Sequence, residues 1–281
     1  MENSRQLRVA LVQAPIEWEN PEANRNRFGR QLGELQGKAD VALLPETFTT
    51  GFSMDAAALA EPVGGTTLPA VKSWAAAYGL AIAGSFIAGE NGRYFNRGFF
   101  VTPEGDVRLY DKRHLFRMAG ENEHYTPGNT RLVVPYKGWN IALIICYDLR
   151  FPVWCRNVNN EYDVLLCCAN WPEARARAWR TLLEARAIEN MAYVCGVNRV
   201  GTDGNGIPFR GDSLAFSPKG EIVAEARIPS LPHANGHSPN PAVAGGNNEQ
   251  TPCIATLDKE ALLRFRTKFP AWQDMDRFVI D

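Results

Sequence analysis

The sequence predicts a layered α/β protein with a mixed β-sheet and helices on its outside. Short apolar runs rich in β-branched residues recur along the 281 residues, and several alternate with segments whose apolar residues lie at helical spacing. This alternation is typical of strands joined by helices. Other runs are joined by short turns that contain Pro and Gly, which is typical of antiparallel hairpins. A chain with both kinds of connection is expected to build a sheet with mixed strand directions.

The first half of the chain begins with an alternating strand at residues 7–14. Pro21 then opens a helix, because Phe28 and Leu32 follow at helical spacing. Residues 114–128 are polar, aromatic and punctuated by glycine, and we expect them to form a functional loop. The other expected elements are strands at 41–45 and 80–86, a helix at 68–78, and a hairpin of strands 95–102 and 107–111.

The second half is expected to continue the same alternation. The expected elements are a strand at 141–145, a helix at 153–159, a strand at 163–169, a helix at 175–190, a strand at 192–198, a hairpin of 213–216 and 221–224, a strand at 254–257 and a helix at 259–268. In the helix at 175–190 the apolar stripe comprises Trp179, Leu182, Leu183 and Ile188, and its arginines are expected on a solvated or subunit-facing side. Residues 227–251 show no periodicity and predict a long loop or an ordered excursion from the fold.

Composition excludes several classes of partner. The chain has 30 basic and 31 acidic residues, a net charge of −1 and no long block of one sign, which argues against a nucleic-acid or membrane-surface role. No uncharged apolar run approaches the roughly 20 residues that a membrane helix requires. The N-terminus enters a strand without a secretory segment. We therefore expect one soluble, cytoplasmic domain over residues 1–281.

The six cysteines show neither a CxxC pair nor Cys/His spacing for a metal. Most are expected to be reduced thiols in the core, which fits a reducing compartment. Cys146 is different, because it follows a buried strand directly and precedes polar residues. A strand that turns sharply at such a residue pushes its side chain out of the sheet, near free backbone N–H groups. Cys146 is therefore a candidate nucleophile, which needs a nearby base to form its thiolate.

Two more polar residues follow buried strands, Glu46 and Lys112. Because ends of neighbouring strands meet at one edge of an α/β sheet, we expect these side chains to share a pocket with Cys146. Glu46 can take the thiol proton, and the Lys112 ammonium can stabilise a thiolate or an oxyanion. The backbone N–H of Tyr147 is the expected second oxyanion donor. His114 and His124 are expected to form hydrogen bonds within their loop.

These residues resemble the nitrilase superfamily of carbon–nitrogen hydrolases. The resemblance rests on three motifs in the same order, LPETFTTGF around Glu46, DKRHLF around Lys112 and CYDLRFP around Cys146. It implies a four-layer αββα sandwich, a Glu-Lys-Cys triad, homodimers or larger homo-oligomers, and no metal or organic cofactor. It also implies a second catalytic glutamate in the loop after the lysine, for which Glu121 fits and Glu123 is the alternative.

The segments ANWP at 169–172, ARAIEN at 185–190 and RFRTKFPAWQDMDRF at 264–278 are similar to those of the bacterial omega-amidase branch. This branch implies a small-molecule amide substrate, the terminal amide of 2-oxoglutaramate or 2-oxosuccinamate. A substrate carboxylate requires a cation, for which Arg150 is the candidate. Trp171 and Phe116 are candidates for the wall around the aliphatic part.

Two other functions remain open at this stage. The first keeps the triad and changes the bond, as in a nitrilase or an N-carbamoyl amide hydrolase. The second is a binding module that has the fold without catalysis.

Overall fold

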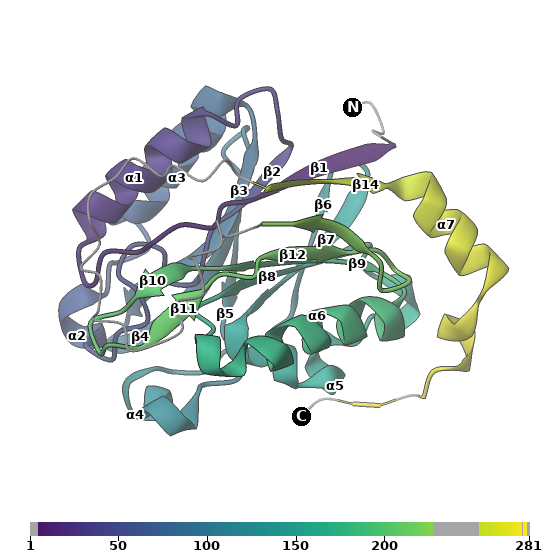
Figure 1. Cartoon of the computed structure of the whole chain (residues 1–281). Helices are drawn as coiled ribbons and strands as arrows, with labels where there is room; N and C mark the ends of the chain where they lie inside the picture. Colours follow the sequence, from purple (N-terminus) through teal and green to yellow (C-terminus); the bar gives the residue numbers. More distant parts are fainter. Residues whose placement is uncertain (1–4, 227–252, 277, 280–281) are drawn as a thin grey trace, which may run out of the picture.

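Two six-stranded β-sheets pack face to face, and helices cover the outer face of each (Figure 1). The computed structural model describes residues 5–226, 253–276 and 278–279. The predicted layered α/β fold and its four αββα layers are confirmed. The loop predicted at 227–251 lies outside the described residues.

The first sheet has mixed strand directions. Its strands, in spatial order, are β14 (Cys253–Asp258), β1 (Gln6–Leu11), β2 (Val41–Leu43), β3 (Ala81–Glu90), β4 (Arg93–Val101) and β5 (Val107–Asp111). The central strands β1, β2 and β3 are parallel, whereas β14, β4 and β5 join them by antiparallel pairing. Consequently β2 and β5 run in the same direction and end at the same edge of the sheet.

The second sheet repeats this arrangement. Its strands, in spatial order, are β13 (Ile222–Glu225), β12 (Leu214–Phe216), β9 (Tyr193–Asn198), β8 (Val164–Ala169), β7 (Trp139–Ile145) and β6 (Leu132–Tyr136). Here β7, β8 and β9 are parallel, β6 and β12 pair antiparallel with β7 and β9, and β13 pairs antiparallel with β12. A separate hairpin is formed by β10 (Val200–Thr202) and β11 (Pro208–Arg210).

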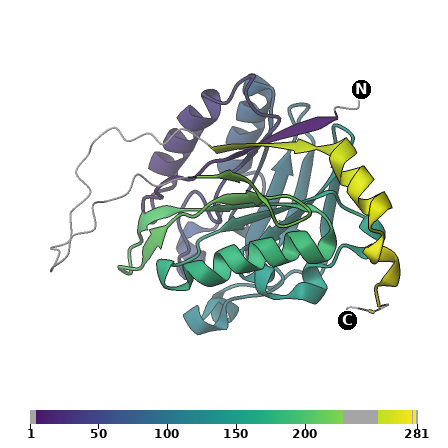
Figure 2. The same ribbon diagram turned by 45° about the vertical axis from the view of Figure 1, so that its right-hand side comes forward.

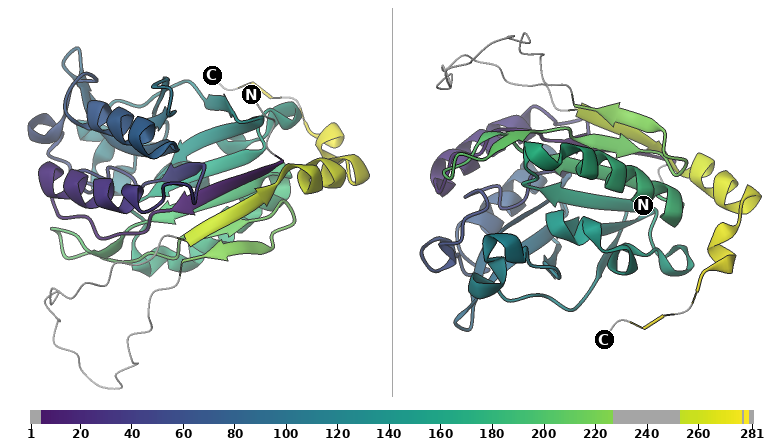
Figure 3. Two further views of the ribbon diagram at one scale, coloured as in Figure 1. Left: turned by 90° about the horizontal axis from the view of Figure 1, so that it is seen from above. Right: turned by 60° about the horizontal axis from the view of Figure 1, so that its bottom comes forward.

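Helices α1 (Pro21–Gly33) and α3 (Thr67–Tyr78) lie side by side over the first sheet (Figure 3). Alternation along β1 explains this layer, since Val9 belongs to the core between the sheets while Ala10 faces the helices. Helix α6 (Ala176–Asn190) lies beneath the second sheet (Figure 2). It packs so closely on β9 that a methyl group at Gly196 would lie 2.6 Å from the side chain of Leu183.

The remaining helical elements are short, apart from α7. They are α2 (Ala56–Leu59), α4 (Glu121–His124), α5 (Pro152–Cys155) and α7 (Lys259–Lys268), with 3₁₀ turns η1 (Arg117–Ala119), η2 (Cys146–Arg150), η3 (Val158–Asn160), η4 (Glu173–Arg175) and η5 (Ala271–Asp274). Within the described residues, no helix has both the length and the apolar character needed to cross a membrane.

An ion cluster ties the two sheets together. Asp40, just before β2, accepts hydrogen bonds from the Arg8 side chain at 3.1 Å and from Lys137 Nζ at 2.7 Å. Arg8 lies on β1, and Lys137 lies in the turn between β6 and β7 of the second sheet. Burial by itself raises the pKa of Asp40, but the hydrogen bonds from Arg8 and Lys137 outweigh it, and the pKa lies below the usual value. We call Arg8, Asp40 and Lys137 the interlayer ion cluster.

Three predictions about elements were wrong. The helix expected at 153–159 is limited to α5, because Arg156 adopts an extended conformation with ψ of 130° and ends the helical path. Arg186 of α6 was expected on a solvated side, but it is buried and donates to the Leu149 carbonyl at 2.7 Å. Ile188, assigned to the apolar stripe of α6, is half exposed. In addition, strand β6 was not foreseen.

Candidate active site

Cys146 stands at a sharp turn directly after β7. Its φ is +43°, a left-handed conformation that costs a side-chain-bearing residue about 1–2 kcal/mol. The turn is held by Asp148, which accepts the Ile145 N–H at 3.0 Å and the Tyr110 hydroxyl at 2.6 Å. Both contacts are buried. The strain indicates that the backbone is bent in order to present the thiol outside the sheet.

Glu46 and Lys112 form a buried ion pair beside this thiol. Lys112 Nζ donates to Glu46 Oε1 at 2.9 Å, and neither side chain is more than 1% exposed. Asn96 Nδ2 donates to the same oxygen at 2.8 Å, and the Asn170 N–H donates to Oε2 at 2.9 Å. These three donors therefore hold the Glu46 carboxylate in one orientation beside Cys146.

Glu121 of α4 is the second carboxylate at Lys112. Its two oxygens accept Lys112 Nζ at 2.9 and 3.0 Å, and Oε2 also accepts the Phe116 N–H at 2.5 Å. Glu121 is fully buried, whereas Glu123 is exposed on the same short helix. Of the two glutamates that the sequence left open, the structure thus brings Glu121 to the lysine.

The ionisation of these groups is strongly coupled. Burial alone would lower the pKa of Lys112, but the charges of Glu121 and Glu46 hold it well above its usual value. Burial raises the pKa of Glu121, and the charge of Glu46 raises it further against the opposing effect of Lys112. Burial also raises the pKa of the Cys146 thiol, as do the charge of Glu46 and a hydrogen bond to it, while Lys112 lowers it. The resting thiol is consequently protonated, and its proton must move when it attacks.

The route by which these groups meet differs from the expected one. We expected neighbouring strands of one sheet, but Glu46 and Lys112 follow β2 and β5 of the first sheet, while Cys146 follows β7 of the second. The site lies where the edges of two stacked sheets meet. Asn170, after β8, joins them, because its side-chain amide donates to the Glu46 carbonyl at 2.6 Å.

A small cavity of about 80 Å³ opens onto the thiol. The predicted residues Phe116, Tyr147, Arg150 and Trp171 all line it, together with Glu46, Lys112 and Cys146. The further lining residues are Phe52, Ala119, Asn170, Pro172, Arg175, Asp203, Ile207 and Phe209. This volume is well below the roughly 300–1,000 Å³ of drug-sized ligand sites, which indicates a small substrate.

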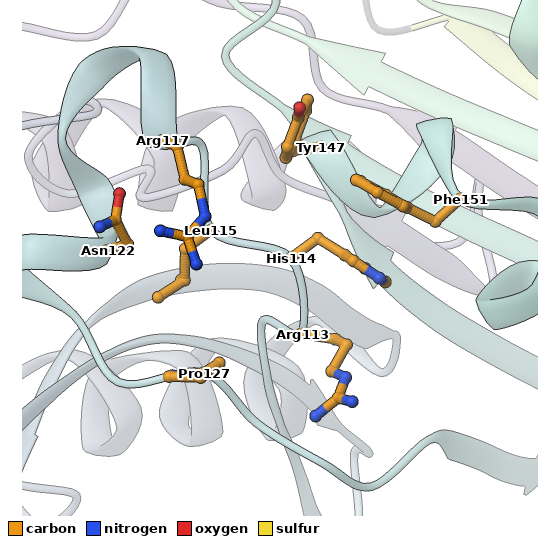
Figure 4. Close-up of a pocket in the computed structure, with 8 residues that line it drawn as sticks. All are labelled: Arg113, His114, Leu115, Arg117, Asn122, Pro127, Tyr147 and Phe151. Atoms are coloured by element: carbon orange, nitrogen blue, oxygen red, sulfur yellow. The ribbon is translucent and has the colours of Figure 1, made fainter. Parts of the chain in front are cut away.

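A second cavity of about 640 Å³ shares Tyr147 with the first (Figure 4). Its walls are Tyr147 and Phe151 on one side and loop residues, including Arg113, Arg117 and Asn122, on the other. His114, also in its wall, contacts Asp148 Oδ1 through Nδ1 at 2.9 Å and stacks on Phe151. His114 forms a hydrogen bond as expected, but its partner Asp148 lies in η2, outside the loop at 114–128. No cysteine lines this larger cavity, so the thiol chemistry belongs to the smaller one.

Sequence reasoning missed Asn96 altogether. It lies on β4, where its backbone carbonyl accepts the Lys112 N–H at 3.0 Å, so pairing between β4 and the end of β5 brings it to the carboxylates. A polar amide inside the run YFNRGFFV was the available signal, since a buried strand position rarely holds an unpartnered Asn. Within the described residues, no group of three or more His, Cys, Asp or Glu is arranged to hold a metal ion.

Comparison with known proteins gives consistent matches. The carbon-nitrogen hydrolase family model matches residues 8–228. The chain is 45% identical to Omega-amidase YafV of Escherichia coli (strain K12) over 276 residues, covering 97% of this chain and 98% of that protein. It is 32% identical to the 2-oxoglutaramate amidase of Bacillus subtilis (strain 168) over 221 residues, covering 77% and 85%.

Among solved structures, the chain resembles a CN-hydrolase superfamily protein of Xanthomonas campestris that has an arsenic adduct in its active site. The TM-score is 0.90 at 41% identity, covering 99% of this chain and 100% of the other.

Proposed function

The chain belongs to the carbon–nitrogen hydrolase family, and from this premise we propose that it is an omega-amidase that hydrolyses the terminal amide of a small 2-oxo-dicarboxylate monoamide, 2-oxoglutaramate or 2-oxosuccinamate. As a member of this family it is a hydrolase of carbon–nitrogen bonds other than peptide bonds. The observation that carries the proposal is the Cys146 thiol facing the buried Glu46–Lys112 pair in a small cavity that also holds arginines.

The first half-reaction forms a thioester. Glu46 takes the proton of Cys146 while the sulfur attacks the amide carbonyl carbon. The resulting oxyanion is stabilised by the Lys112 ammonium and by the N–H of Tyr147, which lies in the first turn of η2 where N–H groups have no intrahelical acceptor. Glu46 then gives its proton to the departing nitrogen, the carbon–nitrogen bond breaks, and ammonia leaves.

The second half-reaction hydrolyses the thioester. Glu46, again unprotonated, takes a proton from a water molecule that attacks the acyl carbon. Glu121 orients this water and holds Lys112 in place through its two hydrogen bonds. Collapse of the second oxyanion breaks the carbon–sulfur bond, returns the proton to Cys146 and releases the 2-oxo acid. No step requires a metal or an organic cofactor.

Recognition of the substrate is assigned to three residues that line the cavity. Arg150, with its guanidinium carbon 4.9 Å from the centroid of the Trp171 ring, is placed to pair with the carboxylate. Trp171 and Phe116 would enclose the aliphatic carbons.

We further propose that the protein acts in the cytoplasm as a homodimer or larger homo-oligomer. All six cysteines are free, which fits a reducing compartment. The homo-oligomer is proposed from the family resemblance alone. Light scattering on purified protein would measure the oligomer size, and a monomer at micromolar concentration would refute this part.

The test of the proposed activity is ammonia release from 2-oxoglutaramate, set beside an aliphatic nitrile and an N-carbamoyl amino acid. We expect the 2-oxo monoamide to have the highest kcat/KM. Turnover of the nitrile or of the carbamoyl compound alone would refute the substrate assignment while leaving the family chemistry in place. Turnover of none of them, with a Cys146 no more reactive than other thiols, would favour a binding module.

A further inference from the structure

Two half-buried arginines line the small cavity, Arg150 and Arg175. In the part of the chain that the structure describes, neither side chain forms a hydrogen bond or a salt bridge. Other shielded arginines do have protein partners. Arg97 pairs with Asp111, Arg186 with Glu189 and Arg266 with Asp163. Arg199 instead donates to backbone carbonyls, including that of Ile16 at 2.9 Å. A partly buried guanidinium without a counter-ion is costly unless a ligand supplies the anion.

Both guanidiniums are held on aromatic faces. Arg150 lies over Trp171, and the guanidinium carbon of Arg175 lies 5.3 Å from the centroid of the Phe116 ring. The Trp171 indole also donates to the Arg175 carbonyl at 2.9 Å. Trp171 therefore fixes the backbone of Arg175 and the guanidinium of Arg150. Stacking of this kind orients a guanidinium and leaves its positive charge available.

The carboxylates that line the cavity do not neutralise these charges. Glu46 is engaged by Lys112, Asn96 and the Asn170 N–H. Asp203 Oδ1 accepts the backbone N–H groups at Asn205 and Ile207 of its own turn, each at 2.9 Å. In addition, α6 begins directly after Arg175, and the partial positive charge of its N-terminus adds to the field. The arginine end of the cavity is therefore built for an anion.

We propose that Arg175 is a second substrate-recognition residue, which with Arg150 clamps the 2-oxo acid end of the substrate. This inference rests on the proposed function and deepens it. A 2-oxo acid presents three acceptor oxygens, two on the carboxylate and one on the adjacent carbonyl. One guanidinium fork pairs with two oxygens, so the third calls for a second donor. The clamp also disfavours glutamine, whose α-ammonium would replace the carbonyl oxygen and face a guanidinium.

The kinetic test compares wild type with Arg175→Gln and Arg175→Lys. Loss of the fork should raise KM for 2-oxoglutaramate about 10- to 100-fold and change kcat by less than about 3-fold, because the contact is made equally in the ground and transition states. Lysine should recover part of the loss, since it restores charge without the fork. Arg177→Gln, an exposed position two residues along, is the matched control and should behave as wild type. An unchanged KM in Arg175→Gln would overturn the proposal.

A binding test separates this proposal from the proposed activity. 2-Oxoglutarate is titrated into Cys146→Ala and into Cys146→Ala with Arg175→Gln, by calorimetry. We expect the Kd to rise about 10-fold or more in the double variant. A higher Kd in the double variant would support the role of Arg175 even if wild type failed to hydrolyse 2-oxoglutaramate. That failure would refute only the proposed activity. Equal Kd values, or no binding to Cys146→Ala, would overturn the role of Arg175.

Discussion

Glu121→Gln tests whether the second carboxylate is part of the catalytic unit. In the wild type, this side chain accepts two hydrogen bonds from Lys112 Nζ, one from the Phe116 N–H and a longer one, 3.4 Å, from Asn96 Nδ2. Glutamine keeps the shape but replaces one acceptor oxygen by an NH₂ donor. Because all three neighbours are donors, Lys112 loses one of its two acceptor oxygens here in either orientation of the amide, and either the Phe116 N–H or Asn96 loses its acceptor as well.

The size of the effect follows from those contacts. A hydrogen bond to a charged group contributes about 1.5–3 kcal/mol, and a buried donor left unpaired costs about 1–3 kcal/mol. Lys112 keeps Glu46, so the loss stays below the roughly 3–5 kcal/mol of an ion without any partner. We expect the free energy of unfolding to fall by about 2–3 kcal/mol. A loss of this size in the transition state lowers kcat/KM about 30- to 150-fold.

Two measurements check this prediction, steady-state ammonia release from 2-oxoglutaramate and chemical denaturation. Glu123→Gln is the control, because this exposed glutamate lies on the same helix. It should leave kcat/KM within about 2-fold and the free energy of unfolding within about 0.5 kcal/mol of wild type. If Glu121→Gln retained full kcat/KM, or if Glu123→Gln lost as much, the assignment of the second carboxylate would be wrong.

Three further predictions concern reactivity and stability. Iodoacetamide should modify Cys146 before Cys253, the other half-buried thiol. Because the pKa of the Cys146 thiol is raised, the rate of its modification should still be rising above about pH 8.5. Peptide mass spectrometry measures the rates at both thiols, and equal rates would count against an activated thiol. Asp40→Asn should lower the free energy of unfolding by about 1 kcal/mol at neutral pH. Because the pKa of Asp40 is lowered, its contribution to stability is present above the ordinary pKa of 3.8 and is lost as pH falls through the folded-state pKa. Denaturation curves of variant and wild type should therefore converge in acid. A difference that stays constant with pH would contradict the role of the interlayer ion cluster. Gly196→Ala should destabilise by about 1–3 kcal/mol, because its methyl group would overlap Leu183, and an unchanged denaturation midpoint would show that α6 moves aside freely.

The local character of the site could be predicted from the sequence because it depends on strand ends. Glu46 and Cys146 follow buried apolar runs, whose burial fixes where the polar residue emerges. The strand before Lys112 was expected to be buried as well, but of β5 only Tyr110 is buried. The meeting of these three site residues across two sheets was not predictable from the residues alone, since no local pattern encodes which sheets stack. Residue spacing also left Glu121 and Glu123 open, and only the short helix α4 decides which one points inward.

Two of the errors come from tertiary contacts. Arg186 looked like a surface arginine by helical spacing, yet the Leu149 carbonyl draws it inside. Asn96 had no motif, and its role appears only when β4 pairs with the end of β5. Strand β6 was missed for a different reason, since Pro135 interrupts its apolar run LVVPY, but the strand lies at a sheet edge where proline is tolerated. The single domain over residues 1–281 stays a prediction.

Intact-protein mass spectrometry tests the central claim most directly. Wild type is mixed with 2-oxoglutaramate and quenched with acid within its first turnovers. The account predicts that wild type gains the mass of the 2-oxo acyl group, bound to Cys146. It predicts that Cys146→Ala shows neither this adduct nor ammonia release. Ammonia release at the wild-type rate by Cys146→Ala would contradict it.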